Sequence, residues 1–249
     1  MDRNIAYQTD QLVRYFSHNR IAWPQFYESE RVIIDGLKLD SHRSVLDIGC
    51  GCGGLGLALH ERFGVRSYTG VEINPLAAQA ATGMNAQAQI LCGDILQLNQ
   101  QELGGRRFDV VFSLSCVDWN VQFADMLAAA WSRVVDGGYL VATFRLTDGA
   151  GCDDMARSYQ YINFDGVRAG ELAAYVVLNA GQLMQLLLGF EPAEINAYGY
   201  WGAPSLSAVT PYERLCFCAF SIRKRGADAR VLSPRLQLPA EIRHAMETV

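Results

Sequence analysis

The sequence predicts an α/β fold, a doubly wound and mostly parallel sheet with helices on both faces, and three observations lead to this prediction. Apolar runs of strand length alternate with runs of helical spacing from Val45 onward, which is typical of a parallel sheet with helical crossovers. A glycine-rich turn joins the first strand of this series to the first helix. The last two apolar runs, at 194–200 and 215–223, are joined by a loop, so we expect an antiparallel pair.

Residues 1–40 precede the first strand and form a predicted N-terminal helical cap. The segments 10–16 and 28–37 carry apolar residues at helical spacing, and Pro24 marks a helix start. Aromatic and hydrogen-bonding side chains are dense between the two segments. These aromatic residues have two open interpretations: they pack the cap onto the core, or they line the mouth of a site.

The core is predicted over residues 41–225, and each element has a local signal. Pro75 opens the helix at 76–81, Asn179 caps the helix at 180–188, and Asp136-Gly137-Gly138 ends the helix at 123–134. A less regular insertion spans 147–179, and residues 226–249 are predicted to form a surface tail. The strands are expected at 45–48, 68–73, 89–92, 108–114, 139–146, 194–200 and 215–223.

The turn after the first strand is the most informative stretch. It contains Gly49, Gly51, Gly53 and Gly54, so it can adopt positive φ and can hold a ligand against backbone N–H groups at a helix N-terminus. Asp47 lies inside the apolar strand just before the turn, where a carboxylate is costly unless it is hydrogen-bonded. A glycine turn without a ligand would explain the glycines but not the acid.

Residues 49, 51 and 54 also satisfy the G-x-G-x-x-G fingerprint of dinucleotide-binding folds. An NAD(P)-dependent oxidoreductase is therefore one alternative. Asp47 argues against it, because a nicotinamide-binding strand is normally apolar at that position. No residue suited to assist hydride transfer is evident either.

Two later strand ends, at 71–74 and 92–95, follow the glycine-rich turn at the spacing expected for the second and third strands of the same sheet. With them, the sequence resembles the class I S-adenosylmethionine (SAM)-dependent methyltransferases. Residues 45–53 look like the first motif of that family, Glu72 like its acidic second-strand end, and Asp94 and 108–114 match the third and fourth strand ends. The resemblance covers residues 41–145 in register and extends more loosely to 223. It implies a Rossmann-like sheet of seven strands in the order 3-2-1-4-5-7-6, SAM as cofactor and S-adenosylhomocysteine (SAH) as product. No metal is expected, because no cluster of acids suggests a magnesium site.

The carboxyl ends of parallel strands meet in one crevice, so the acids that follow these strands should converge there. The resemblance implies that Glu72 accepts from ribose hydroxyls and Asp94 from the adenine amino group, with Ile95 as an apolar face. Gly49 and Gly51 would contact the methionyl part, while Asp47 orders the loop or reaches the ammonium through water. The alternative for the acids is that they are solvated strand ends. The predicted cofactor-binding residues are Asp47, Gly49, Cys50, Gly51, Glu72, Ile73, Asp94, Ile95, Leu114 and Trp119.

Methyl transfer from a sulfonium depends mainly on holding the acceptor atom in line, and a base helps only if the acceptor keeps a proton. The candidate bases are His18, Asp118 and Tyr200. Arg145 ends an apolar central strand, so it could clamp a carboxylate or phosphate of the acceptor, or form a buried salt bridge with an acid such as Asp118. In the family the cap shapes the mouth of the site, and the candidates for that mouth are Tyr15, His18, Arg20, Trp23 and Tyr27.

Composition and missing motifs exclude several classes of acceptor and of binding partner. Half of the 249 residues are apolar and 19% are charged, and the net charge of −5 does not favour a nucleic-acid partner. Seven cysteines without a Cys-x-x-Cys pair or a secretory signal predict reduced thiols in the cytoplasm, and no apolar run reaches the length of about 18 residues that spans a membrane. The Asn/Asp-Pro-Pro motif of base-amine methyltransferases is missing after the fourth strand. We therefore expect a small or medium-sized organic acceptor methylated on O or N, with a homodimer left open; a non-catalytic SAM-binding module is a further alternative.

Overall fold

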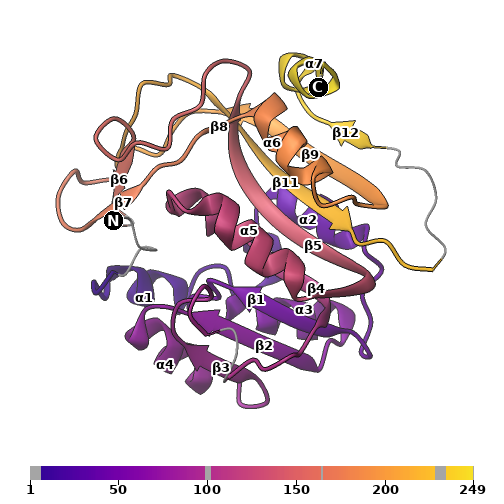
Figure 1. The fold of residues 1–249 in the computed structure, drawn as a ribbon. Helices are drawn as coiled ribbons and strands as arrows, with labels where there is room; N and C mark the ends of the chain where they lie inside the picture. Colours follow the sequence, from indigo (N-terminus) through magenta and orange to yellow (C-terminus); the bar gives the residue numbers. More distant parts are fainter. Residues whose placement is uncertain (1–6, 99–101, 164, 228–233, 249) are drawn as a thin grey trace.

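A large mixed sheet forms the centre of the protein in the computed structural model, which describes residues 7–98, 102–163, 165–227 and 234–248 (Figure 1). The sheet is built, among the described residues, from β1 (Ser44–Ile48), β2 (Ser67–Glu72), β3 (Gln89–Cys92), β4 (Phe108–Ser113), β5 (Val134–Thr147), β8 (Leu178–Asn179), β9 (Glu194–Gly202), β11 (Leu215–Arg223) and β12 (Arg235–Gln237).

The strand order is β12-β9-β11-β5-β4-β1-β2-β3, and β8 pairs with β5. Without β12 and β8, this is the predicted order 3-2-1-4-5-7-6, and the doubly wound fold is confirmed. β11 is antiparallel to both β5 and β9, whereas β1, β2, β3, β4 and β5 pair in parallel. The carboxyl ends of β1, β2 and β4 therefore lie at the same edge of the sheet.

Helices cover both faces of the sheet, and the strands alternate their side chains between two apolar layers. In β4, Val111 packs into the layer with α5 (Phe123–Ser132), α6 (Ala180–Leu188) and α7 (Ala240–Glu247). Its neighbours Val110 and Phe112 point to the other layer, with α2 (Glu28–Asp35) and α3 (Gly54–Phe63). The remaining helices of the described chain are α1 (Gln11–Phe16), η1 (Trp23–Gln25), α4 (Pro75–Met84) and η2 (Val117–Trp119).

The prediction for the glycines at 136–138 is wrong. The helix α5 ends at Ser132, and β5 begins at Val134, so these residues belong to the strand. Gly137 has φ +79, and the pairing of β4 with β5 shifts register between Phe108 and Val110. A Cβ on Gly138 would lie 2.6 Å from the carbonyl oxygen of Asp109. The glycines thus allow an irregularity and a close approach of two strands.

The last part of the chain contributes to the core, although it was predicted as a surface tail. β12 adds a parallel edge strand to β9, and α7 follows it. Leu238, Ile242 and Met246 are buried in the same apolar cluster as Leu183 and Leu187 of α6. Apolar residues four positions apart give this short, otherwise polar helix one buried face.

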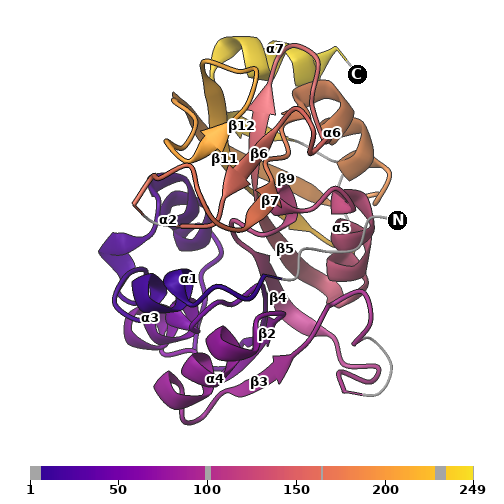
Figure 2. The ribbon, with the colours of Figure 1, turned by 90° about the vertical axis from the view of Figure 1, so that its left-hand side faces the viewer.

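The insertion forms a small antiparallel sheet next to the start of the chain. It consists of β6 (Tyr159–Tyr161) and β7 (Leu172–Ala174), joined by β10 (Ala208–Val209) from the loop after β9. Leu12 of α1 packs against Ile162 and Ala173 of this sheet. Figures 1 and 2 show β6 and β7 beside the N-terminal segment in both views.

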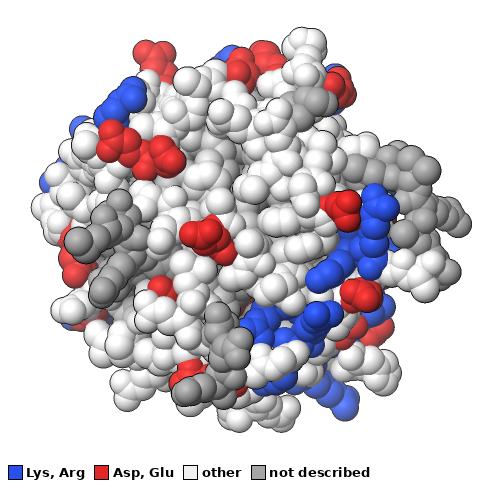
Figure 3. All heavy atoms as spheres, in the orientation of Figure 1, with Lys and Arg blue, Asp and Glu red and all other residues white. Residues whose placement is uncertain are grey.

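Charge is distributed unevenly over the surface. Arg106 and Arg107 precede β4, Arg133 precedes β5, and Lys224 and Arg225 follow β11, at the edge of the sheet opposite the carboxyl ends of β1 and β4. Figure 3 shows Lys and Arg gathered in the lower right part of one face, with a few acids among them. In the described part of the chain, no helix is both long and apolar enough to cross a bilayer.

If α7 belongs to the folded core, truncating its buried face should destabilise the whole protein. We expect Ile242→Ala to lower the free energy of unfolding by about 2–4 kcal/mol, because the Ile242 side chain is completely buried. Leu206→Ala is the control, since Leu206 is 80% exposed, and it should change stability by less than about 0.5 kcal/mol. Urea unfolding measures both, and equal stabilities of the two variants would contradict the assignment.

Candidate functional site

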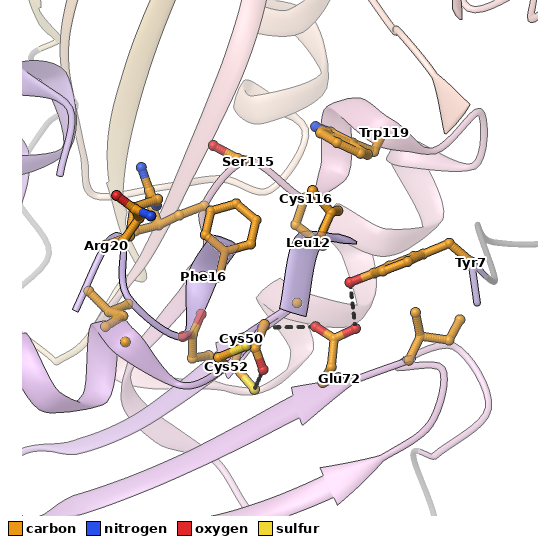
Figure 4. Close-up of a pocket in the computed structure, with 18 of the residues that line it drawn as sticks. Tyr7, Leu12, Phe16, Arg20, Cys50, Cys52, Glu72, Ser115, Cys116 and Trp119 are labelled. Carbon is orange, nitrogen blue, oxygen red and sulfur yellow. Dashed lines mark hydrogen bonds between the residues drawn. The ribbon is translucent and has the colours of Figure 1, made fainter. Parts of the chain in front are cut away.

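A pocket of about 160 Å³ lies at the carboxyl ends of β1, β2 and β4, beneath the cap and the N-terminal segment (Figure 4). Three separate strand ends contribute to its lining, as expected for an open parallel sheet. Most of the predicted cofactor residues line it: Asp47, Gly49, Cys50, Gly51, Glu72, Ile73, Leu114 and Trp119.

The Glu72 carboxylate organises one end of this pocket. Its oxygens accept the backbone N–H of Gly51 at 2.8 Å, the backbone N–H of Asn74 at 2.8 Å and the hydroxyl of Tyr7 at 3.3 Å. Glu72 is only 3% exposed, and this burial raises the pKa of its carboxyl group despite the three donors. The carboxylate thus holds the glycine turn, the start of α4 and the N-terminal segment together.

The N-terminal segment is fixed over the pocket from two further sides. Asn74 caps α4 with its side-chain oxygen and donates from its amide nitrogen to the carbonyl oxygen of Tyr7 at 3.0 Å. Glu171, at the start of β7, accepts the backbone N–H groups of Gln8 and Thr9, the latter at 2.7 Å. The insertion and the carboxyl end of β2 therefore both bind the same short N-terminal segment.

Asp47 is buried at the end of β1, as the sequence suggested for a hydrogen-bonded acid. The Tyr68 hydroxyl donates to its Oδ2 at 2.6 Å. Burial raises the pKa of the Asp47 carboxyl to about 7, while the Tyr68 bond and the nearby Arg20 guanidinium lower it. The nearby carboxyl group of Glu72 also contributes to the raised pKa of Asp47.

Glycine is required at different positions of the turn for different reasons. Gly49, Gly51 and Gly53 all have positive φ, between 54° and 77°. A Cβ on Gly51 would meet nothing within 4 Å, so this glycine leaves its side open to the pocket. A Cβ on Gly54 would collide with the backbone carbonyl of Arg20, so this glycine lets the cap pack against the start of α3.

Two predicted adenine contacts do not line this pocket. Asp94 is half-buried and accepts the N–H of Leu96 at 2.9 Å in the turn after β3. Ile95 is buried in the main core cluster. Their roles toward a cofactor remain predictions.

The four residues predicted for catalysis also lie outside the lining. Arg145 pairs with Asp118 (Nε to Oδ2, 3.2 Å), donates to the Asp118 carbonyl at 2.8 Å and stacks 3.8 Å above the ring of Tyr175. This is the buried salt bridge that the sequence left open as an alternative. His18 is exposed at the end of α1, and Tyr200 is half-buried on β9.

Several lining residues had not been assigned to the cofactor site. Three of them, Ser115, Cys116 and Asn120, follow β4. Their position after a parallel strand could have identified them as lining residues from the sequence. Tyr7, Phe16 and Asn19 come from the N-terminal segment and cap, where no local pattern marks them. Arg20 had been named only as a candidate for the mouth. Among the described residues, no group of three or more His, Cys, Asp or Glu side chains is placed to hold a metal ion.

Comparisons with known proteins agree with this geometry. Residues 45–138 match the family model of a methyltransferase domain. The ribosomal protein L11 methyltransferase of Chromohalobacter salexigens is 40% identical over 108 residues, which are 43% of this chain and 34% of that protein. The chain thus spans about a third of the length of this relative.

Two further similarities extend over most of the chain. The malonyl-[acyl-carrier protein] O-methyltransferase of a Marinomonas species is 23% identical over 206 residues, which are 76% of this chain and 74% of that protein. The structure of the Burkholderia thailandensis 1,6-didemethyltoxoflavin-N1-methyltransferase, with its substrate and SAH bound, matches 85% of this chain and 81% of that chain with a TM-score of 0.53 and 19% identity. This structural match shows the shared fold.

Substitution of Gly51 tests whether a ligand lies against the turn. Gly51→Val should abolish SAH binding, because its side chain would project into the pocket, and it should also cost stability at a positive φ. Gly104→Val is the matched control, since Gly104 also has φ +54 and free space but lies outside the pocket. Calorimetry should show lost binding only for Gly51→Val; normal binding would mean that the ligand does not lie on this turn.

The raised pKa of Asp47 predicts a pH dependence of stability. Between about pH 4 and pH 7 the folded protein holds a proton on Asp47 that the unfolded chain has lost, so this residue lowers stability as pH rises through that range. Its contribution is at most about 1.4 kcal/mol per pH unit. Tyr68, Arg20, Glu72, Glu30 and Cys50 are the titratable groups that interact with it.

We expect Asp47→Asn to reduce the difference between the unfolding free energies at pH 5 and pH 7.5, because the amide cannot titrate and can still accept from Tyr68. Urea unfolding at both pH values measures this. The same difference in variant and wild type would place the pH dependence elsewhere, with Glu72 the next group to test.

Proposed function

Because the chain belongs to the class I SAM-dependent methyltransferases, we propose that it transfers the methyl group of SAM to an O or N atom of a small or medium-sized organic acceptor. The observation that carries the proposal is the convergence of Asp47, the glycine turn, Glu72 and Leu114 on one pocket. They come from three strands that topology alone brings together.

The residues of the pocket suit the cofactor. Glu72 would hold the ribose hydroxyls, since a buried carboxylate offers charged acceptors. The backbone of Gly49 and Gly51 would lie against the methionyl part, and Leu114 and Ile73 offer apolar contacts beside it. When bound, SAM supplies a sulfonium methyl group that is open to in-line displacement.

We propose that the side chains of the protein promote the reaction mainly by positioning the acceptor. The lining near the cap combines the rings of Phe16, Phe26 and Trp119 with the polar side chains of Asn19 and Asn120. Such a surface can orient an acceptor by stacking and by hydrogen bonds. Among the described residues, none of His18, Asp118, Tyr200 and Arg145 lines the pocket, so we propose an acceptor atom that arrives already deprotonated and needs no base.

The partial cover over the pocket favours a small acceptor over a macromolecule. The N-terminal segment, held by Glu72, Asn74 and Glu171, covers the pocket, and the cap closes it near Arg20. A protein or nucleic acid would need an open rim at this edge. The ribosomal protein L11 methyltransferase similarity makes a protein acceptor the alternative to test.

The test uses SAM labelled on its methyl group, incubated with the protein and a cell extract split into low- and high-molecular-mass fractions. We expect label to enter the low-mass fraction, and calorimetry to show binding of SAH but not of NAD+. Glu72→Gln should weaken SAH binding by about 1.5–3 kcal/mol, because one acceptor oxygen and the charge are lost.

Asp109→Asn is the matched control, because Asp109 accepts the Ser44 N–H and hydroxyl at the opposite end of the sheet and lies outside the pocket. It should bind SAH normally. Label in the protein or RNA fraction would contradict the small acceptor, and binding of NAD+ instead of SAH would contradict the cofactor.

A further inference from the structure

A second cavity, of about 210 Å³, lies between α2 and the sheet. Its lining comes from the second half of α2, from the two residues that follow this helix closely, and from β5, β9, β11 and β12. Among the described residues, it shares no lining residue with the pocket that contains Glu72. The proposed methyl transfer therefore leaves this cavity without a role.

The floor of the second cavity is a polar face of the sheet. Arg235 of β12 lies beside Asn196 of β9, which lies beside Ser221 of β11. Glu194 precedes Asn196 by two positions, so both side chains project to the same face, whereas Ile195 between them is buried on the other face. The Asn196 amide nitrogen donates to Glu194 Oε1 at 2.6 Å and to Ser221 Oγ at 3.4 Å. These neighbours hold the Glu194 carboxylate in place.

Two opposite charges lie on this floor without pairing with each other. In the part of the chain that the structure describes, the Arg235 guanidinium has neither a hydrogen bond nor an ion pair. In the same part, Glu194 accepts from the Asn196 side chain only, so its carboxylate has room for further donors. With about 4.8 Å between strands and about 3.3 Å per residue, the Cα atoms of Arg235 and Glu194 lie roughly 8 Å apart. One small molecule can therefore contact both side chains.

The wall that α2 contributes to the second cavity is apolar. Val32, Ile33 and Leu37 line it, and Val32 is 38% exposed although it is a large apolar residue. Ile33 and Leu37 belong to a buried cluster against which the rings of Tyr139 and Tyr198 pack. The cavity thus combines a floor that carries two opposite charges with an exposed apolar wall.

We propose that the second cavity binds a free α-amino acid with an apolar side chain, with its carboxylate on Arg235, its ammonium on Glu194 and its side chain against Val32. A zwitterion is complementary to both charges of the floor. Glu194 repels a molecule that carries only an anion, and Arg235 repels one that carries only a cation, so the pair selects against both. This proposal goes beyond the proposed function and does not depend on it.

The experiment titrates the protein with L-leucine and with two molecules that each lack one of its charges. 4-Methylpentanoate keeps the carboxylate, isoamylamine keeps the ammonium, and both keep the branched side chain. We expect L-leucine to bind roughly 10-fold more tightly than either, as for one additional hydrogen bond between charged groups. Glycine keeps both charges but should also bind more weakly, because it lacks the apolar side chain. Ligand-detected NMR or calorimetry measures the four dissociation constants.

Two substitutions test the two charges separately. In Arg235→Gln we expect L-leucine and 4-methylpentanoate to bind roughly 10-fold more weakly, whereas isoamylamine should bind no more weakly, because Glu194 is still present. In Glu194→Gln the loss should affect L-leucine and isoamylamine but not 4-methylpentanoate. Arg225→Gln is the matched control, since Arg225 is also an exposed arginine but donates to the Glu191 carbonyl at 2.8 Å and lies outside the cavity. It should change none of these affinities.

No binding of L-leucine, L-valine or L-phenylalanine at about 10 mM would overturn the proposal. Equal affinities for L-leucine and 4-methylpentanoate would do so as well, and so would an unchanged affinity for L-leucine in both variants. Displacement of L-leucine by SAH would also contradict it, because the amino acid would then lie in the other pocket. If one variant does not fold, the other decides alone. Failure of the wild type to bind SAH would refute only the proposed function.

Discussion

The need to satisfy a buried carboxylate at the end of β2 determines much of the local structure. Glu72 is almost fully buried, and a charge in that position is tolerated only when donors surround it. Its donors are the Gly51 N–H in the turn after β1, the Asn74 N–H at the N-terminus of α4 and the Tyr7 hydroxyl. One side chain thereby sets the path of the glycine turn, the start of a helix and the route of the N-terminal segment. These three contacts form one end of the pocket.

The sequence could predict the strand order and the residues at strand ends because both depend on local patterns. Apolar runs, glycines and a parallel topology suffice to bring Asp47, Gly51 and Glu72 together. The glycines at 136–138 were misplaced because positive φ serves a helix end and a strand irregularity equally well. The pairing of β4 with β5 decides between the two, and that is a tertiary contact.

The contribution of the N-terminal segment could not be predicted for the same reason. Tyr7 and Arg20 reach the pocket through contacts with Glu72, Glu30 and Gly54, which lie 65, 10 and 34 positions away in the sequence. Arg145 was open to two interpretations, because an arginine at a strand end can face a ligand or an acid. The short helix η2 places Asp118 beside it, and no spacing in the sequence encodes that approach.

The literal G-x-G-x-x-G pattern has a different physical basis here from that of a dinucleotide site. In dinucleotide-binding folds the third glycine permits close packing of helix and strand. Here Gly54 admits the Arg20 carbonyl from the cap. Gly49 makes room for the side chain of Cys116, which a Cβ would approach to 2.5 Å. Gly49 and Gly54 thus serve packing between the turn, the loop after β4 and the cap, whereas Gly51 leaves its side open to the pocket.

The hydrogen bond between the Tyr7 hydroxyl and Glu72 limits how a ligand can bind in the pocket. A carboxylate has about four lone-pair positions, and protein donors already occupy at least three of those on Glu72. If Glu72 holds a ribose as proposed, the two ribose hydroxyls would need two of these positions, so one protein donor would have to be displaced. The two backbone donors belong to the turn and to the start of α4, whereas the Tyr7 contact is the longest at 3.3 Å. In the proposed complex a ribose hydroxyl would therefore replace the Tyr7 hydroxyl, and Glu72 would gain fewer than two hydrogen bonds.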